Sequence, residues 1–152
     1  MNRIEELERV LEAEVELGEA LLQLLANKQR SIVGLQSEVL SQLLAQEEQL
    51  LRPFQTLEVE RVRLTAALVG ASDSGPKPTY GTISVVELMD HLPATDSVRI
   101  ATMATRLRTV VERILLMNGQ NRVLLQRSLR FVQDTLRLVT EDHTRALVDH
   151  RA

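Results

Sequence analysis

The stretch that decides the fold is residues 96–147, DSVRIATMATRLRTVVERILLMNGQNRVLLQRSLRFVQDTLRLVTEDHTRAL. It contains no proline, and Gly119 is its only glycine. Asp96 is a good N-cap residue, so the stretch predicts one continuous helix. At 1.5 Å per residue this helix is roughly 75 Å long. Because that is too long for a compact globule, we expect the rest of the chain to supply an equally long helical partner.

An apolar band runs along one face of this predicted helix. It covers roughly 140° of the helical wheel, which is wider than the seam of a two-stranded coiled coil. Either the helix packs on two neighbours, or part of the band stays open as a groove for another helix. Two rows with a seven-residue repeat form the band: Met103, Val110, Met117, Leu124, Phe131 and Leu138, and Ala104, Val111, Asn118, Leu125, Val132 and Val139. Ile100, Leu107, Ile114, Asn121 and Ser128 fall between the two rows, and Leu129 and Leu136 widen one edge.

Two asparagines, Asn118 and Asn121, interrupt the band, and Gly119 lies between them. A polar residue at a core position costs stability unless it is hydrogen-bonded, but it can fix register or mark a contact site. The sequence is compatible with a hydrogen-bonded core pair, with a local bend at Gly119, and with a binding site.

The first part of the chain predicts a helical hairpin over residues 3–69. Asn2 and Glu5 have the spacing of a capping box, which starts a helix. Apolar residues then recur at helical spacing, and Gly34 is a stop signal. We therefore expect the first helix of the hairpin over residues 3–33.

The second helix of the hairpin is expected over residues 37–69, with Ser37 as its N-cap. Pro53 lies inside this stretch, where proline removes one helical hydrogen bond. Because the seven-residue leucine pattern keeps its phase across Pro53, we predict a kink there rather than an end. A helix that ends at Leu51 and restarts at Pro53 is the alternative. The repeating leucines are Leu43, Leu50, Leu57 and Leu64.

A loop separates this hairpin from the long helix. Residues 70–82 are rich in glycine, proline and serine, which predicts a loop. Ser84 and Glu87 then have capping-box spacing and predict a short helix over residues 84–92, which ends before Pro93.

The composition favours the same fold class. Hydrophobic residues make up 44% of the chain, enough for a packed core, but only three residues are aromatic. Leucine and valine dominate, which is typical of long helices rather than of sheets. We predict an all-α fold in a single domain over residues 1–152. It is an elongated antiparallel helical bundle of three long helices plus one short helix, with coiled-coil-like packing.

Several function classes are excluded by the sequence. No cysteine is present, so disulfides, thiolate metal sites and a cysteine nucleophile are ruled out. No apolar run reaches the ~18–20 residues of a membrane span. The N-terminus is too acidic for a signal peptide, so a cytoplasmic protein is expected.

Catalysis is not expected either. The three histidines, His91, His143 and His150, have no Glu-x-x-His pairing, and we interpret them as solvated surface residues. There is no glycine-rich phosphate loop and no nucleophile-elbow motif. We predict no enzyme activity, no cofactor and no metal site.

Charge is unevenly distributed along the chain. Residues 1–69 carry seven basic and twelve acidic side chains, a net charge of −5. Residues 98–138 carry eight arginines and two acids, a net charge of +6. The two parts attract each other within one bundle, or the basic helix meets an acidic partner. Nucleic-acid binding is not expected, because the arginines lie on two faces and stacking aromatics are missing.

The stretch 118–132, NGQNRVLLQRSLRFV, resembles a motif of the FlgN family. That motif has Asn-x-x-Asn, then a leucine pair, then a Ser-Leu-x-Phe-like stretch on the last long helix. The first half of the chain, from Glu19 to Arg61, is similar to the family in the order and spacing of its residues. The resemblance covers about residues 5–70 and 96–139.

The resemblance implies a cytosolic chaperone of flagellar type III protein export. Family members bind the C-terminal helical segment of the hook–filament junction proteins and prevent premature assembly. They deliver these cargo proteins to the export gate, and the resemblance allows the gate and the ATPase complex of the export apparatus as further partners. The resemblance also implies which residues bind the partner: Asn118, Asn121, Leu124, Leu125, Ser128, Leu129, Phe131 and Val132.

The sequence allows a second interpretation, a structural or adaptor coiled-coil protein without export cargo. A partly open band also permits a homodimer. Some relatives dock on the export gate through a tyrosine in a C-terminal tail. Here the one tyrosine is Tyr80, in the predicted loop, so the sequence does not predict docking by such a tail.

Overall fold

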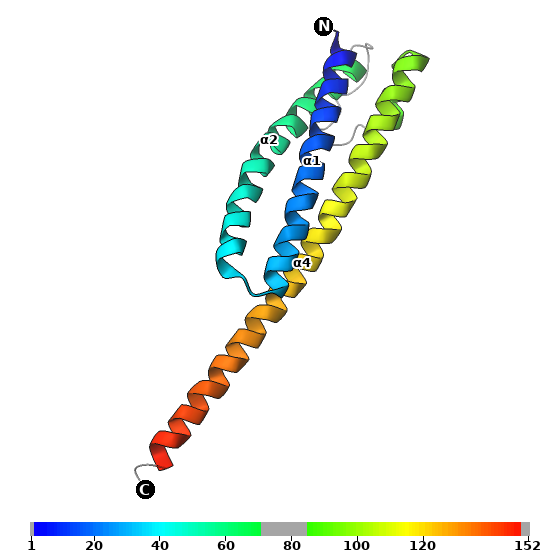
Figure 1. Ribbon diagram of the computed structural model, residues 1–152. Coiled ribbons are helices and arrows are strands. Elements are labelled where there is room, and N and C mark those ends of the chain that lie inside the picture. The colour runs from blue at the N-terminus through cyan, green and yellow to red at the C-terminus, as the bar shows by residue number, and fades with distance from the viewer. Residues whose placement is uncertain (1, 71–84, 150–152) are drawn as a thin grey trace.

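A computed structural model describes residues 2–70 and 85–149 of the chain (Figure 1). Within these residues every regular element is an α-helix, and three of the helices are long. The predicted all-α fold is therefore confirmed. The helices are α1 (Arg3–Val33), α2 (Ser37–Gly70), α3 (Val85–Met89) and α4 (Ala94–Asp149).

Helix α1 begins where the capping box predicts. The Asn2 side chain accepts a hydrogen bond from the Glu5 backbone N–H at 2.9 Å. In return, the Glu5 carboxylate accepts one from the Asn2 backbone N–H at 3.2 Å. These two bonds satisfy amide groups that have no partner within the helix.

The end of α1 differs from a simple glycine stop. Gly34 stays right-handed with φ −82°, and the next residue, Leu35, takes the left-handed conformation with φ 53°. The Leu35 N–H donates to the Ile32 carbonyl at 3.2 Å, and the Gln36 N–H to the Ser31 carbonyl at 2.9 Å. This is a Schellman motif with leucine at the position that usually holds glycine.

Helix α2 runs from Ser37 to Gly70 without interruption at Pro53. The prediction that the helix does not end there is confirmed, and the alternative break after Leu51 is wrong. The helix is bowed in Figure 1. Gly70, which we expected in the loop, is the last residue of α2. The remainder of that predicted loop lies outside the described residues.

The two later helices differ from prediction at their ends. The short helix, expected over residues 84–92, is observed as Val85–Met89, and position 84 lies outside the described residues. Its last turns tighten, because the His91 N–H donates to the Leu88 carbonyl at 3.0 Å. Helix α4, expected over residues 96–147, begins earlier and ends later.

The start of α4 also corrects the predicted cap. The Pro93 carbonyl accepts the first helical hydrogen bond, from the Ser97 N–H at 2.9 Å, so the helix starts at Ala94. Asp96 therefore lies in the first turn of α4 rather than at its cap. Its negative charge is favourable near a helix N-terminus, and its carboxylate accepts a hydrogen bond from Arg99.

Helix α1 lies between α2 and α4 (Figure 1). Helix α2 runs antiparallel to α1, whereas α4 runs in the same direction as α1. A close approach between α1 and α4 depends on Gly18, since a Cβ atom there would lie 2.5 Å from Val110 Cγ1. Any larger residue at position 18 would push the two helices apart.

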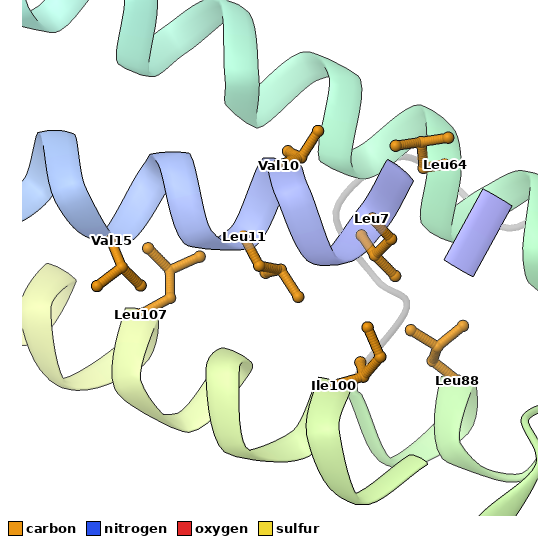
Figure 2. Packing of buried hydrophobic residues seen from close by; sticks show 8 residues of the cluster. All are labelled: Leu7, Val10, Leu11, Val15, Leu64, Leu88, Ile100 and Leu107. Carbon is orange, nitrogen blue, oxygen red and sulfur yellow. The ribbon is translucent and has the colours of Figure 1, made fainter. Parts of the chain in front are cut away.

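The buried apolar residues form two clusters along α1. The larger cluster joins α1 to α2, α3 and α4 near their ends, and Figure 2 shows its side chains. The smaller cluster lies further along α1 and joins it to α4. The larger cluster contains Leu7, Val10, Leu11, Val15, Leu64, Leu88, Ile100 and Leu107, and the smaller one Leu21, Leu25, Val110 and Ile114.

The expectation that α4 has an equally long partner is wrong. Helix α4 has 56 residues, whereas α1 has 31 and α2 has 34. At 1.5 Å per residue these helices are about 84, 47 and 51 Å long. The C-terminal half of α4 therefore projects beyond the turn between α1 and α2 (Figure 1).

Candidate partner-binding surface on α4

The N-terminal half of α4 uses its apolar band within the chain. Ile100, Leu107, Val110 and Ile114 are all buried, and they pack in the two core clusters. Of the two interpretations of the wide band, packing against neighbours therefore applies to this half.

Asn121 is only 3% exposed, and it is the last buried residue of α4 among those whose burial the structure describes. Its side-chain amide donates a hydrogen bond to the Leu25 carbonyl on α1 at 3.1 Å. Its carbonyl oxygen has no hydrogen-bond partner within the described residues. The asparagine thus fixes the register of α1 against α4. While these helices stay together, a partner protein cannot reach it.

The other asparagine, Asn118, is half-buried, and Gly119 beside it is exposed. Helix α4 continues through Gly119. A Cβ atom added at Gly119 would meet no atom within 4 Å, so no close approach requires glycine there.

After Asn121 the same band becomes accessible. Leu124 and Ser128 are half-buried, while Leu129 is 55% and Phe131 62% exposed. We define the open face as the exposed apolar residues of this half that belong to the band: Leu125, Leu129, Phe131, Val132, Leu136, Leu138 and Val139. The last three were not among the residues that the family motif implied, although the seven-residue repeat extends to them.

The open face meets the turn between α1 and α2 in a hollow of about 240 Å³. Side chains from three helices line it, so the hollow could not be read from the motif on α4. Phe131 does not line it. Its lining residues are Ser31, Ile32, Leu35, Gln36, Ser37 and Leu40 on one side and Leu125, Ser128, Leu129 and Val132 on the other.

Leu35 combines strain with exposure at the rim of this hollow. A left-handed conformation costs a non-glycine residue about 1–2 kcal/mol, and the Leu35 side chain is more than half exposed. Neither burial nor backbone geometry within the chain explains a leucine at this position. Strain of this kind is often found at binding sites.

The arginines of α4 also divide into two groups. In the N-terminal half, Arg99 Nε lies 3.1 Å from a Glu8 carboxylate oxygen, and Arg106 Nη2 lies 3.0 Å from a Glu19 oxygen. These pairs tie α4 to α1. Four arginines of the other half have no ion-pair partner among the residues the structure describes: Arg122, Arg127, Arg130 and Arg137.

In the described ranges 2–70 and 85–149, no three acidic or histidine side chains are grouped so that they could hold a metal ion. No helix among these residues has the length and apolar character needed to cross a bilayer.

An all-helical fold with one long helix whose apolar band is only partly paired defines a class of elongated helical proteins. The comparison with protein families gives a family within this class, because the sequence model described as FlgN protein matches residues 1–148. The chain belongs to the FlgN family, whose members are flagellar export chaperones rather than enzymes. No curated protein and no solved structure was matched.

Proposed function

We propose that the open face of α4 binds the C-terminal helical segment of the hook–filament junction proteins in the cytoplasm. In this role the chain prevents premature assembly of its cargo and delivers it to the flagellar type III export apparatus. One observation carries the proposal: the apolar band of α4 is buried by α1 only as far as Asn121, although it continues to Val139. An amphipathic helix is the natural ligand of such a strip.

The proposed site contains seven residues with direct access to a partner, those of the open face. Leu124 and Ser128 lie at its boundary and are half-buried. Asn118 is half-buried as well and lies at the same boundary. Asn121 contributes indirectly, since its hydrogen bond to α1 determines where the paired part of α4 ends. Asn121 therefore positions the site rather than contacts the cargo.

Binding can be measured by titrating the full chain with a C-terminal peptide of a hook–filament junction protein from the same cell. We expect saturable binding that weakens at least about tenfold in Leu129→Asp, because a carboxylate would be buried against apolar groups. The matched control is Leu116→Asp. Leu116 is 64% exposed and Leu129 is 55% exposed. Leu116 lies about 200° round the helix from the buried Ile114, so it is on the side of α4 that faces away from the band.

The proposal fails if the peptide does not bind, or if both aspartate variants bind it as well as the unchanged chain. Absence of binding would favour the second interpretation, a structural or adaptor coiled-coil protein without export cargo. Circular dichroism of each variant checks that the helices remain formed.

A further inference from the structure

Helix α1 shows how a helix pairs with the apolar band of α4. Its apolar residues cover the band, and its acidic residues reach arginines at the edge. Glu8 pairs with Arg99 and Glu19 pairs with Arg106. The N-terminal half of α4 thus already holds an acidic amphipathic helix, which serves as a template for a ligand of the other half.

The C-terminal half of α4 also carries arginines beside the band, and Arg127 has no ion-pair partner among the described residues. Arg127 falls in the same seven-residue series as Arg99 and Arg106, and it lies one turn from both Leu124 and Phe131. Residues 122–139 contain four arginines and one aspartate, a net charge of +3. Asp134, seven residues after Arg127, is the one acid within this stretch, and Glu141 and Asp142 follow the open face. A ligand with acidic edges would complement this stretch.

The hollow at the α1–α2 turn supplies an apolar anchor at one end of the open face. It lies between Leu35, which is held in a strained conformation, and Leu129 on α4. Its volume of about 240 Å³ accommodates a large apolar side chain. Aromatic or aliphatic anchors in such pockets carry a large share of binding energy at interfaces.

We infer that the ligand of the open face is an amphipathic helix with acidic residues along its edges, one of which pairs with Arg127. One large apolar side chain of that helix occupies the hollow beside Leu35. This inference rests on the proposed function for its site and adds the chemistry of the partner. Charge favours such a partner over a second copy of this chain, because a second copy would bring the same four arginines to the open face.

The test uses two designed peptides as probes, with the full chain as receptor. Both peptides are amphipathic helices of about six turns with identical apolar positions, and their edge residues are all glutamate or all lysine. We expect the glutamate peptide to bind at least about fivefold more tightly at low salt, since exposed ion pairs contribute up to about 1 kcal/mol each. The difference should shrink as salt is added.

Charge reversal at Arg127 tests the specific contact. Arg127→Glu should weaken binding of the glutamate peptide roughly fivefold and strengthen that of the lysine peptide. The matched control is Arg130→Glu, the same change at an exposed residue about 180° round the helix from Asn121. If both variants change peptide affinity equally, the effect comes from net charge alone, and the proposed pairing of Arg127 with an acid of the ligand is wrong.

Leu35→Ala tests the anchor. It should weaken binding of the glutamate peptide several-fold while leaving its preference over the lysine peptide unchanged, because the hollow loses apolar area and the charges stay. An unchanged affinity would show that no apolar side chain of the ligand is anchored beside Leu35.

The outcomes separate this inference from the proposed function. If a junction-protein peptide binds and Leu129→Asp abolishes binding, but no acidic preference is seen, the inference fails and the proposed function stands. If the acidic preference is seen but no junction-protein peptide binds, the proposed function fails and the inference about the ligand's chemistry stands. Analytical ultracentrifugation completes the test, and a stable dimer lost in Leu129→Asp would overturn the inference in favour of a second copy.

Discussion

The two halves of α4 carry the same apolar pattern but have different environments. From Ala94 to Asn121 the band is buried against α1, and two arginines at its edge, Arg99 and Arg106, pair with acids of α1. From Arg122 onward the band is open, and Arg122, Arg127, Arg130 and Arg137 have no ion-pair partner among the residues the structure describes. The repeat therefore determines which face of a helix is apolar, and the lengths of the neighbouring helices determine how much of that face remains for a partner.

The largest expected contrast between the two halves is in the free energy of unfolding that a leucine-to-alanine change removes. Leu107 is 8% exposed and Leu138 is 62% exposed. Leu107→Ala should lower the free energy of unfolding by about 2–5 kcal/mol, because it leaves a cavity in the core. Leu138→Ala should change it by no more than about 0.5 kcal/mol. Urea denaturation followed by circular dichroism measures both, and similar costs would contradict the division of α4.

Glycine substitutions provide the next largest contrast. Gly18→Val should destabilise the fold by about 1–3 kcal/mol, because the new side chain overlaps Val110. Gly119→Ala should instead stabilise the chain by up to about 1 kcal/mol, since alanine favours a helix and the site is open. Thermal denaturation of the two variants checks the opposite signs. A stabilising Gly18→Val would mean that α1 and α4 do not pack as closely as described.

A smaller change in stability is expected at the strained turn residue Leu35. Leu35→Gly should raise the free energy of unfolding by about 1 kcal/mol, because glycine adopts φ 53° without the steric cost that leucine bears. Leu35→Ala keeps a Cβ atom and should show no such gain. Both variants should bind a partner more weakly if the Leu35 side chain makes apolar contact with a ligand side chain in the hollow. Stability equal in both would argue against stored strain.

The smallest effect concerns Glu14, which is buried on α1 and ion-paired with Arg61 of α2 at 3.0 Å. Burial raises the pKa of Glu14 above the usual 4.5, although Arg61 opposes the shift. With a raised folded-state pKa the native state binds more protons, so this group's contribution to stability is greatest below pH 4.5 and declines as pH rises through the raised pKa.

Glu14→Gln should remove this decline. Comparing the unfolding free energies of the two proteins from pH 4 to pH 7 isolates the contribution of Glu14 from those of other carboxylates. The difference in stability between variant and unchanged chain should therefore shift in favour of glutamine as the pH rises. A constant difference across this range would contradict the raised pKa.

Much of the fold follows from local sequence signals. The capping box of Asn2 and Glu5 gave the start of α1, and the phase of the leucines across Pro53 gave a continuous α2. The absence of proline after Pro93 predicted that α4 is one continuous helix, although both of its ends lie outside the predicted ones. These are properties of a few neighbouring residues, which is why a single sequence reveals them.

The candidate site was only partly accessible to such reasoning. The band on α4 looks alike on both sides of Asn121, so the pattern could not reveal that Asn121 is buried and Phe131 exposed. That distinction depends on where α1 ends relative to α4. The hollow could not be predicted, because residues from α1, α2 and α4 line it together with Leu35, and a stop signal at Gly34 does not show that Leu35 is the left-handed residue of the turn.

Hydrogen–deuterium exchange along α4 tests the central claim most directly. In the free chain we expect backbone amides before Asn121 to exchange slowly and those after it to exchange orders of magnitude faster, because only the first half is held by α1. Adding a junction-protein peptide should slow exchange in the second half selectively. Uniformly slow exchange along α4 in the free monomer, unchanged by the peptide, would contradict the claim that the second half of α4 is unpaired and binds a partner.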